Sequence, residues 1–546
     1  MPKQTLRIDS IDGGIALTTF GPKQEGSYDG GYGFEPDFRT SISSRMGGAI
    51  TPAGYAKFSG NEISTSASVN WIITTPKDAS SFVYVYTTDG SFVRYTLSGT
   101  TYGTETDLGT PTSGAGNGMA YYNNYIYLAT PTNISRYGPL DGAAALVDTV
   151  WTGATLGSLT ALTDTTYPTF QAGAVLKNPN HAMHVHKDGF LYFCDVISTS
   201  FATTALQGRG CLHRISTNKV TAEGDTNNGS AYNVLTLPFG WVPTDIESYG
   251  NDLAILAMPG TNLSSLTLQR GNSALFLWDT FSSIPYKQIS LPDPIASSLQ
   301  NVNGNLYVFS GNTTQGTRVS VYSGGEGVEQ VALLSDSMTP MAGAVDAIGD
   351  KVYFGGYISY PAPIMTQQAC VYSLGSKTGE LPRYALHAPA VTTLGSTAPV
   401  TTAVKMTFMD NLVRPSALFA FADSATSGIC SFKTGNTQAA AFRQRWEIGR
   451  PFSVSALRIG MDQAVSSGVI ITPSLLVDNN TTTQILTTLN NTNFPSKTVV
   501  AYKRPEIASV GQENLTLNLA FTGTVASSVV FPIEIDIDTF DVMKTG

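Results

Sequence analysis

Three of the five histidines of the chain lie within six residues, at His181, His184 and His186. If this segment is a β-strand, His184 and His186 share one face and His181 points elsewhere. Two imidazoles on one face suit a transition metal. The sequence shows no third ligand for that face, and polar residues beside an innermost strand are the alternative interpretation. His184 and His186 are therefore candidate metal ligands, but we assign no metal site.

Two groups of carboxylates recur at a spacing of two residues. Glu534, Asp536 and Asp538 alternate with isoleucines, which predicts a solvated strand face that also discourages edge pairing. A Ca²⁺ site needs ligands wrapped around the ion rather than spread along a strand. Asp245 and Glu247 resemble a glycosidase pair only if their carboxyl groups converge at a set separation, which sequence spacing does not show.

No signature of an enzyme class occurs in the chain. The G-x-S-x-G elbow, the H-E-x-x-H zinc motif and the P-loop are all absent from the sequence. Four cysteines without a C-x-x-C pair predict buried free thiols rather than a disulfide framework or a metal site: Cys194, Cys211, Cys370 and Cys430. We therefore assign no catalytic and no cofactor-binding residue and expect a protein that is not an enzyme.

Paired apolar segments predict a repeated β-hairpin between residues 81 and 435. The first strands are at 82–86, 125–128, 190–193, 253–256, 306–309, 352–354 and 418–421. The answering strands are at 92–95, 134–137, 212–215, 275–278, 319–322, 370–372 and 429–432. Asx and Gly residues between or before these segments supply the left-handed backbone of hairpin turns, as at Asn123-Asn124 and Gly349-Asp350.

A single hairpin cannot bury its own apolar face, so such units must stack. Radial stacking predicts an all-β fold with a β-propeller of about seven blades at residues 69–437, six or eight being alternatives. Residues 69–73 are a candidate inner strand of the first blade. The ring closes either by mixing N- and C-terminal strands in one blade or by plain edge contact, and the sequence leaves both open.

The two ends of the chain differ from the repeats. Residues 1–68 are rich in Gly and aromatics and predict an extended N-terminal arm over the propeller or a neighbouring subunit, with a partly ordered leader as the alternative. Residues 438–546 contain six or more short strand candidates, which predicts a β-sandwich. The loop tyrosines are candidate contacts for sugars or partner proteins: Tyr28, Tyr32, Tyr357 and Tyr360.

Composition restricts the partners. Only 13% of residues are charged and the formal net charge is −9, which argues against a large nucleic-acid or anionic-membrane surface, so we expect no sequence-specific nucleic-acid partner. No apolar run reaches the ~18 residues of a membrane span. The N-terminus lacks the apolar core of a secretory signal, so we expect synthesis in a cytosol and release by lysis or within a virion.

The opening segment at residues 8–15, with Gly13-Gly14 after a short apolar and acidic lead, resembles the start of tailed-bacteriophage virion proteins of the tail-nozzle or tail-tubular kind. The order of arm, propeller and terminal β-sandwich, with Trp446 near the start of the last module, is also similar to phage structural proteins. Many members of that family are longer. The resemblance implies a non-enzymatic tail component, made in the host cytoplasm and built into a ring of copies.

Three functions therefore compete. The first is a virion structural protein of the tail (nozzle, hub or tip) that forms a homo-oligomer and contacts other tail proteins. The second is a module that binds a host surface glycan or receptor through propeller loops or the sandwich. The third is a glycan-cleaving enzyme, which requires a deep pocket lined by converging carboxylates or a metal.

Overall fold

The computed structural model describes most strands and many of their turns. It covers residues 3–10, 13–16, 27–32, 49–50, 55–57, 67–78, 81–97, 104–112, 116–130, 133–147, 181–197, 209–216, 231–238, 241–259, 272–312, 316–334, 340, 342–358, 368–375, 384–391, 400–407, 416–422, 427–432, 440–461, 464–465, 467–478, 483–504, 507, 509–522 and 529–540. Within these ranges the chain is all-β, with one short 3-10 turn at Ala342–Ala344. No helix in the described part is long and apolar enough to cross a membrane.

Seven four-stranded antiparallel sheets account for the middle of the described chain, and we number them in chain order. Sheet 1 contains β7 (Val69–Ile73), β8 (Phe82–Thr87), β9 (Phe92–Thr96) and β10 (Glu105–Gly109). Sheet 2 contains β11 (Gly118–Tyr122), β12 (Tyr125–Ala129), β13 (Ile134–Gly138) and β14 (Ala145–Val147). Sheet 3 contains β15 (Met183–Val185), β16 (Leu191–Ile197), β17 (Arg209–Ile215) and β18 (Ala231–Thr236).

The remaining four sheets repeat this order. Sheet 4 contains β19 (Trp241–Tyr249), β20 (Asp252–Pro259), β21 (Ala274–Trp278) and β22 (Lys287–Ser290). Sheet 5 contains β23 (Ile295–Val302), β24 (Asn305–Asn312), β25 (Gly316–Tyr322) and β26 (Glu329–Leu334). Sheet 6 contains β27 (Val345–Ile348), β28 (Lys351–Ile358), β29 (Gln368–Gly375) and β30 (Ala385–Val391). Sheet 7 contains β31 (Val400–Thr407), β32 (Ser416–Ala422), β33 (Ser427–Phe432) and β6 (Tyr55–Lys57).

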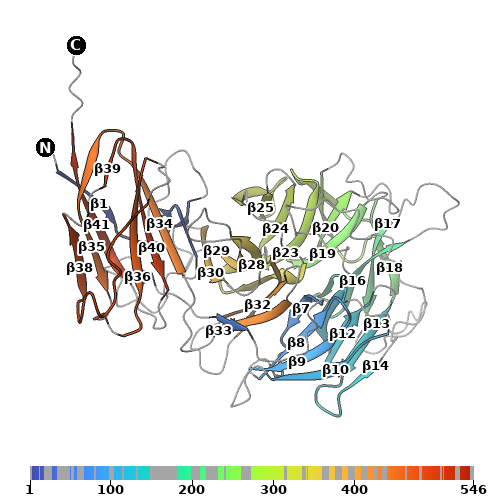
Figure 1. The fold of residues 1–546 in the computed structure, drawn as a ribbon. Helices are drawn as coiled ribbons and strands as arrows, with labels where there is room; N and C mark the ends of the chain where they lie inside the picture. Colours follow the sequence, from blue (N-terminus) through green and yellow to red (C-terminus); the bar gives the residue numbers. More distant parts are fainter. Residues whose placement is uncertain are drawn as a thin grey trace.

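The first strands of these sheets contact one another in a closed circle. β7 contacts β11, and the contacts continue through β15, β19, β23, β27 and β31 back to β7. Figure 1 shows the sheets fanning outward from this circle in a propeller-like ring. Strand β7 is the inner strand of sheet 1, as the sequence predicted. Apolar clusters fill the spaces between successive sheets, so each hairpin buries its apolar faces against its neighbours.

The seven predicted hairpins form the two middle strands of the seven sheets, and every predicted pairing is observed. These strands are mostly apolar on both faces, because both faces of each sheet pack against neighbouring sheets. Two-residue turns precede several of them. Asn123 and Asn124 have φ of 47° and 71°, and Asn303 and Gly304 have φ of 50° and 81°. The turn predicted at Gly349-Asp350 is also observed, directly before β28.

An N-terminal strand closes the ring. Strand β6 pairs with β33, with Lys57 opposite Cys430, so sheet 7 combines three late strands with one early strand. The Ser427 hydroxyl also donates to the Ala67 carbonyl, which fastens the start of the ring to its last sheet. The mixed closure is therefore the one adopted. It joins the N-terminal and C-terminal parts of the ring by backbone hydrogen bonds within one sheet.

The C-terminal residues form two further sheets over one shared core. One has the order β1 (Lys3–Ile8), β41 (Val529–Thr539), β35 (Phe452–Met461) and β38 (Val499–Lys503), with β5 (Ala49–Ile50) and β39 (Val510–Gly511) attached. The other has the order β37 (Gln484–Ile485), β36 (Ile471–Val477), β40 (Asn514–Phe521), β34 (Ala440–Glu447) and β4 (Gly30–Tyr32). A single cluster that includes Leu457, Leu517 and Ile535 joins them. We call these two sheets the C-terminal module.

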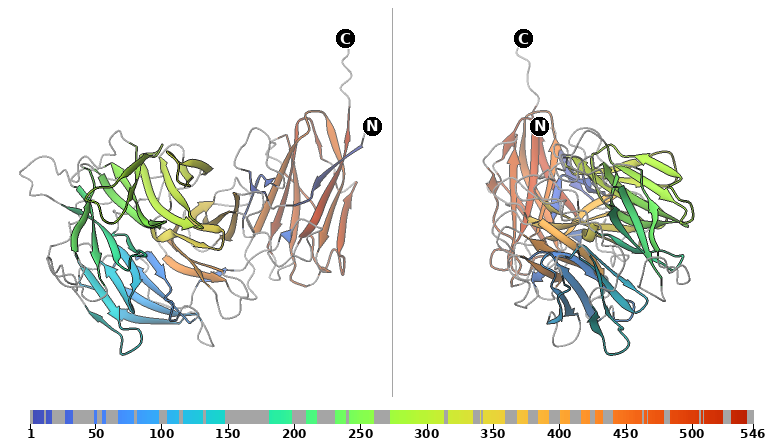
Figure 2. Two further views of the ribbon diagram at one scale, coloured as in Figure 1. Left: turned by 180° about the vertical axis from the view of Figure 1, so that it is seen from behind. Right: turned by 90° about the vertical axis from the view of Figure 1, so that its right-hand side faces the viewer.

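The described strands of the N-terminal arm are mostly built into other sheets, and one part of the arm lies against sheet 6 of the ring. β1 and β5 pair with β41, β4 pairs with β34, and β6 closes sheet 7. Both chain ends therefore lie at the C-terminal module (Figure 2). Strands β2 (Gly14–Ile15) and β3 (Ser27–Tyr28) pair in parallel and lie against β30 of sheet 6 and β34 of the module.

Candidate functional site

The two candidate metal ligands, His184 and His186, both form hydrogen bonds with the hydroxyl of Ser248. His184 Nε2 is 2.7 Å from Ser248 Oγ, and His186 Nδ1 is 2.8 Å from the same oxygen. His186 Nε2 lies 3.1 Å from the Asn251 carbonyl oxygen and must donate its proton there. His186 Nδ1 therefore accepts from the Ser248 hydroxyl, whose oxygen accepts from His184. Burial lowers the pKa of His186, which favours this neutral state.

This chain of hydrogen bonds occupies three of the four ring nitrogens of the pair. His184 also lies 3.4 Å from Glu247 Oε1. The arrangement joins sheet 3 to the inner strand of sheet 4, because Ser248 and Glu247 lie on β19. A metal would have to displace these bonds. The geometry supports a structural role for His184 and His186.

A second group of metal-ligating side chains was not predicted from the sequence. Asp195, Cys211 and His213 lie on the paired strands β16 and β17, and their ligand atoms all lie within 4.8 Å of one another. All three are buried. His213 Nε2 is 3.0 Å from Asp195 Oδ2 and 3.8 Å from Cys211 Sγ. These separations are close to those between the ligands of a tetrahedral zinc ion.

The protonation of His213 opposes a metal at this cluster. The backbone N–H of Asn233 donates to His213 Nδ1 at 2.9 Å, and a backbone N–H cannot act as an acceptor. Nδ1 therefore carries the lone pair, and in the neutral ring Nε2 carries the proton, which it donates to Asp195. A metal on Nε2 would require the loss of that proton, although Nδ1 of the same ring is already unprotonated. The residues do not fit a metal, and the group is a buried hydrogen-bonded link between β16, β17 and β18.

The suggested glycosidase pair lies on β19 and faces sheet 5. Asp245 Oδ2 accepts the backbone N–H of Leu299 at 2.8 Å, and Oδ1 accepts that of Ile246 at 2.9 Å. Glu247 Oε1 accepts the N–H of Ser248 at 2.9 Å. Burial raises the pKa of Glu247 and raises that of Asp245 well above its ordinary value. Raised pKa values suit a general acid, but both oxygens of Asp245 already bind backbone groups.

A third inner-strand carboxylate repeats the link made by Asp245. Asp346 Oδ2, on β27 of sheet 6, accepts the N–H of Met406 on β31 at 2.7 Å. Lys405 Nζ also lies 2.9 Å from that oxygen. Each aspartate thus bonds the inner strand of the next sheet, Asp245 from sheet 4 to sheet 5 and Asp346 from sheet 6 to sheet 7. Asp245 and Asp346 therefore connect neighbouring sheets through backbone hydrogen bonds.

Stacked arginines recur on the first three sheets. The guanidinium carbons of Arg94, Arg136 and Arg214 lie 4.2, 4.5 and 4.5 Å from aromatic ring centroids. The rings are those of Phe82, Tyr125 and Phe190, in the same order. Cation–π contacts of this kind hold a charged group in a fixed position. A sequence signal existed: each hairpin reads aromatic-x-Tyr in its first strand and carries an Arg opposite that tyrosine in the second.

The acidic stripe of β41 lies on its partly exposed face, opposite the buried isoleucines, and pairs with basic neighbours. Arg458 NH2 lies 2.5 Å from Asp536 Oδ2, and its NH1 lies 3.4 Å from Glu534 Oε2. The bond from Arg458, followed by that from Thr5, lowers the pKa of Asp536. The prediction that these carboxylates discourage edge pairing was wrong, because β41 is an interior strand between β1 and β35.

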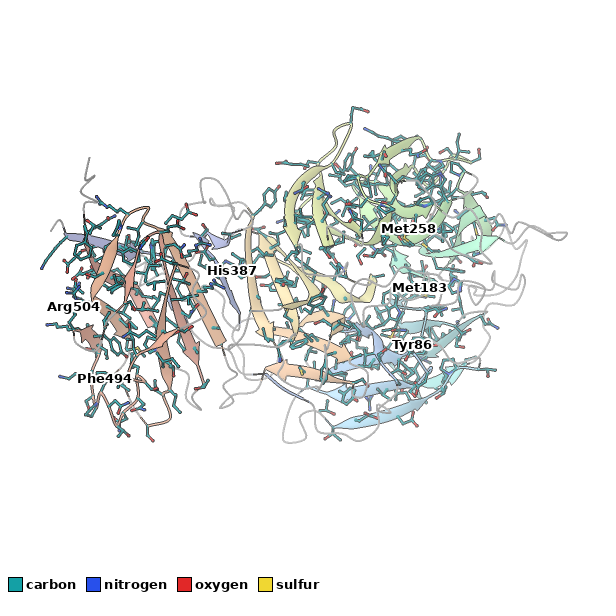
Figure 3. All side chains as sticks on the ribbon, turned by 45° about the horizontal axis from the view of Figure 1, so that its top comes forward. Tyr86, Met183, Met258, His387, Phe494 and Arg504 are labelled. Atoms are coloured by element: carbon teal, nitrogen blue, oxygen red, sulfur yellow. The ribbon has the colours of Figure 1, made fainter. Side chains whose placement is uncertain are left out.

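The candidate sugar-binding tyrosines are only partly described. Tyr28 and Tyr357 are buried, so they are unsuited to bind a partner. The Tyr28 hydroxyl lies 3.1 Å from Nδ1 of His387, which Figure 3 places between the ring and the C-terminal module. The side chain of Tyr32 and the whole of Tyr360 lie outside the described residues. The four cysteines are free and buried, as predicted.

The most exposed large apolar side chain in the described residues lies on a loop that joins β21 to β22. Phe281 is 92% exposed, Ile284 65% and Tyr286 54%. Neither hydrophobic periodicity nor a motif marks this position in the sequence, because its distinguishing property is the solvent exposure of these side chains in the folded chain. We call residues 279–286 the Phe281 loop.

No family model matches the sequence, and no curated protein matches it. Among solved structures, the computationally designed protein Ika8 aligns with a TM-score of 0.37 at 8% identity, covering 70% of this chain and 100% of its own. The Cps50 (Swd1) β-propeller domain of Myceliophteria thermophila gives 0.38 at 12% identity, covering 67% and 97%. U3-55K gives 0.39 at 10% identity, covering 69% and 98%. At such scores these likenesses do not inform function.

Proposed function

We propose that this chain is a non-enzymatic structural protein of a bacteriophage tail, at the nozzle, hub or tip. In this proposal the seven four-stranded sheets are the blades of a β-propeller, and the C-terminal module is a β-sandwich. The protein is made in the host cytoplasm and incorporated into the virion as a ring of copies beside other tail proteins. The family resemblance of the N-terminal segment motivates the virion part of the proposal.

The observation that supports a scaffold most directly is the distribution of the N-terminal strands. Strands β1, β4 and β5 belong to the C-terminal module, whereas β6 belongs to the ring. Gly14 also approaches the backbone of Leu386 so closely that a Cβ there would lie 2.5 Å from the Leu386 oxygen. One continuous segment therefore fastens both parts of the molecule. Such cross-linking favours rigidity over the opening motions that many active sites need.

The described titratable clusters support the same proposal. Asp245, Asp346 and His186 bond neighbouring sheets, and His213 bonds Asp195 within sheet 3. These bonds use atoms that catalysis would require free, and they stabilise the sheets and the contacts between them.

Locating the protein in particles tests the function. Virions of the phage that encodes the chain are purified, their proteins are identified by mass spectrometry, and an antibody against the chain is used for imaging. We expect the protein in purified particles, at the tail, in a fixed number of copies. A protein found in infected cells but missing from particles contradicts the proposal.

A further inference from the structure

Strand β15 makes few apolar contacts with the neighbouring sheet. With three residues it is the shortest inner strand described, and none of its side chains is fully buried. Among the described strands it pairs with β16 of its own sheet alone. Apolar burial along β15 therefore contributes little to the contact with β19 of sheet 4. The hydrogen bonds of His184, Ser248 and His186 are the polar part of that contact.

These hydrogen bonds run in one direction. His184 Nε2 donates to Ser248 Oγ at 2.7 Å, and the Ser248 hydroxyl donates to His186 Nδ1 at 2.8 Å. His186 Nε2 then donates to the Asn251 carbonyl oxygen at 3.1 Å. The order cannot reverse, because a carbonyl oxygen can only accept. Each donor has its own acceptor only while His186 is neutral.

A positive charge on His186 would disturb this order. An imidazolium donates from both nitrogens, so Ser248 Oγ would receive two N–H groups and its own proton would lose its acceptor. His186 is also only 2% exposed, so the cation would be buried. Burial lowers the pKa of His186 although the Asp188 carboxylate opposes this effect. The oxygens of Asp188 already accept the Tyr192 hydroxyl and the Phe190 N–H.

His184 differs because a carboxylate faces it directly. Glu247 Oε1 lies 3.4 Å from His184 Nε2. Protonation of His184 adds a proton at Nδ1 and keeps Nε2 as the donor to Ser248. The Glu247 carboxylate also attracts the new charge. The chain of hydrogen bonds therefore tolerates a charge on His184 but not on His186.

Other titratable groups surround the pair. They are Lys187 and Asp188 in the turn after β15, Tyr192 on β16, Arg214 on β17, Tyr122 on β11 and Asp245 on β19. Lys187 disfavours a positive charge on His186. Tyr122 donates to the Gly189 carbonyl of the same turn at 2.6 Å. Asp245 responds to acid in the opposite sense, because protonation removes a buried charge from its carboxyl.

The joints between other sheets contain groups that tolerate mild acid. Asp346 accepts the Met406 N–H between sheets 6 and 7, and the Ser427 hydroxyl donates to the Ala67 carbonyl where the ring closes. Neither bond buries a new positive charge when a proton is added. A pair of imidazoles in the joint between sheets 3 and 4 has a different response to pH.

We infer that the His184–Ser248–His186 chain is an acid-sensitive joint of the ring. Protonation of His186 in mild acid loosens sheet 3 from sheet 4, while the joints between the other sheets hold. In the opened state His186 meets water and takes up the proton as an ordinary imidazole does, so acid favours opening. The joint does not rest on the proposed phage-tail function.

The free cysteines provide reporters for this joint. Cys194 is buried in the apolar cluster between sheets 3 and 4, together with Leu253 and Phe276 of sheet 4. Cys370 and Cys430 are buried in clusters that join later sheets and serve as references. An opened chain exposes each thiol to water, where all three react alike. The ratio of their labelling rates therefore removes the pH dependence of the thiol group itself.

Labelling of the full chain with dithiodipyridine, followed by mass spectrometry of the cysteine peptides, tests the inference. The rate at Cys194, relative to Cys370 and Cys430, should rise below about pH 6.5, by at most about tenfold per pH unit, the limit for one proton. His186→Asn keeps an acceptor at the position of Nδ1 but cannot be protonated, so its ratio should not rise. Asp245 is present in both chains, so their difference isolates the histidine.

His184→Gln is the matched control, because its amide keeps a donor at the position of Nε2 and leaves His186 in place. It should retain the acid response of the wild type. Circular dichroism at neutral pH identifies a variant that fails to fold. Identical pH responses of the wild type and His186→Asn overturn the inference. A response that is kept in His186→Asn but lost in His184→Gln also overturns it, in favour of His184 as the titrating group.

Discussion

Asp245 on the inner strand of sheet 4 accepts the backbone N–H of Leu299 on the inner strand of sheet 5, at 2.8 Å. Asp346 makes the equivalent bond to Met406 between sheets 6 and 7. A polar group buried without its partner costs about 1–3 kcal/mol. Asp245→Ala should therefore lower the free energy of unfolding by about that amount, measured from urea transitions. Asp141→Ala, at an exposed turn position, should change the midpoint little, and equal losses would refute the link.

The free energy of unfolding should fall as pH rises, because Asp245 loses its proton at a higher pH in the folded chain than in the unfolded chain. Burial raises the pKa of its carboxyl in the folded state, so the unfolded chain loses this proton at a lower pH than the folded chain does. Between those two pKa values the folded state holds more protons, and the free energy of unfolding decreases as pH rises. Asp245→Asn keeps an acceptor for Leu299 but cannot ionise. Its stability should decline less than that of the wild type from about pH 4 upward, the ordinary carboxyl range.

The middle strands of the seven sheets could be predicted because both of their faces are buried. β20 and β24, for example, read as continuous apolar runs. Most inner and outer strands carry no such run, with β7 as an exception. β19 contains Pro243, Asp245 and Glu247, and β22 alternates between buried and exposed residues at the rim. A hydrophobic pattern cannot identify strands that are polar where they meet the centre of the ring or solvent.

The N-terminal arm and the buried clusters could not be predicted for a different reason. The strand β1 is mostly polar, and it is ordered by pairing along its length with β41, over five hundred residues away. Asp195 and His213 meet only because β16 and β17 pair in one register. Long-range pairing decides both, and spacing along the chain does not reveal it. The arginine stacks are the exception, since their pattern recurs in three successive hairpins.

Removing Asp293 should be among the most damaging changes in sheet 5. The buried carboxylate accepts Arg318 Nε at 2.8 Å, the Ser310 hydroxyl at 2.8 Å and Asn312 Nδ2 at 3.0 Å. Asp293→Ala leaves a mostly buried guanidinium uncompensated and should cost about 3–5 kcal/mol in urea unfolding. Asp293→Ala with Arg318→Met removes both charges and should recover part of the loss. No recovery in the double variant would show that the cost comes from packing instead.

The tautomer of His213 predicts that zinc will not stabilise the protein. Its Nδ1 accepts the Asn233 N–H, so Nε2 holds a proton between Asp195 and Cys211. Addition of Zn²⁺ or of EDTA should leave the thermal midpoint unchanged, because a ligand that binds only the folded state would raise it. Metal analysis of protein purified without chelator should find no stoichiometric zinc. A midpoint that rises with Zn²⁺, and does not rise in Cys211→Ala, would establish a metal site.

Alanine substitutions at Gly14 and Gly250 distinguish the cost of backbone strain from the cost of close packing. Both have positive φ, 73° and 62°, so alanine at either position carries a left-handed penalty of about 1–2 kcal/mol. A Cβ at Gly250 meets nothing within 4 Å, whereas at Gly14 it would lie 2.5 and 2.6 Å from the Leu386 oxygen and nitrogen. Gly14→Ala should therefore destabilise the chain by about 1–3 kcal/mol more than Gly250→Ala, the usual range for overpacking. Gly14→Ala should also speed proteolysis of residues 1–57, because the arm would lose its contact with sheet 6. Equal losses in the two variants would mean that the arm does not depend on this contact.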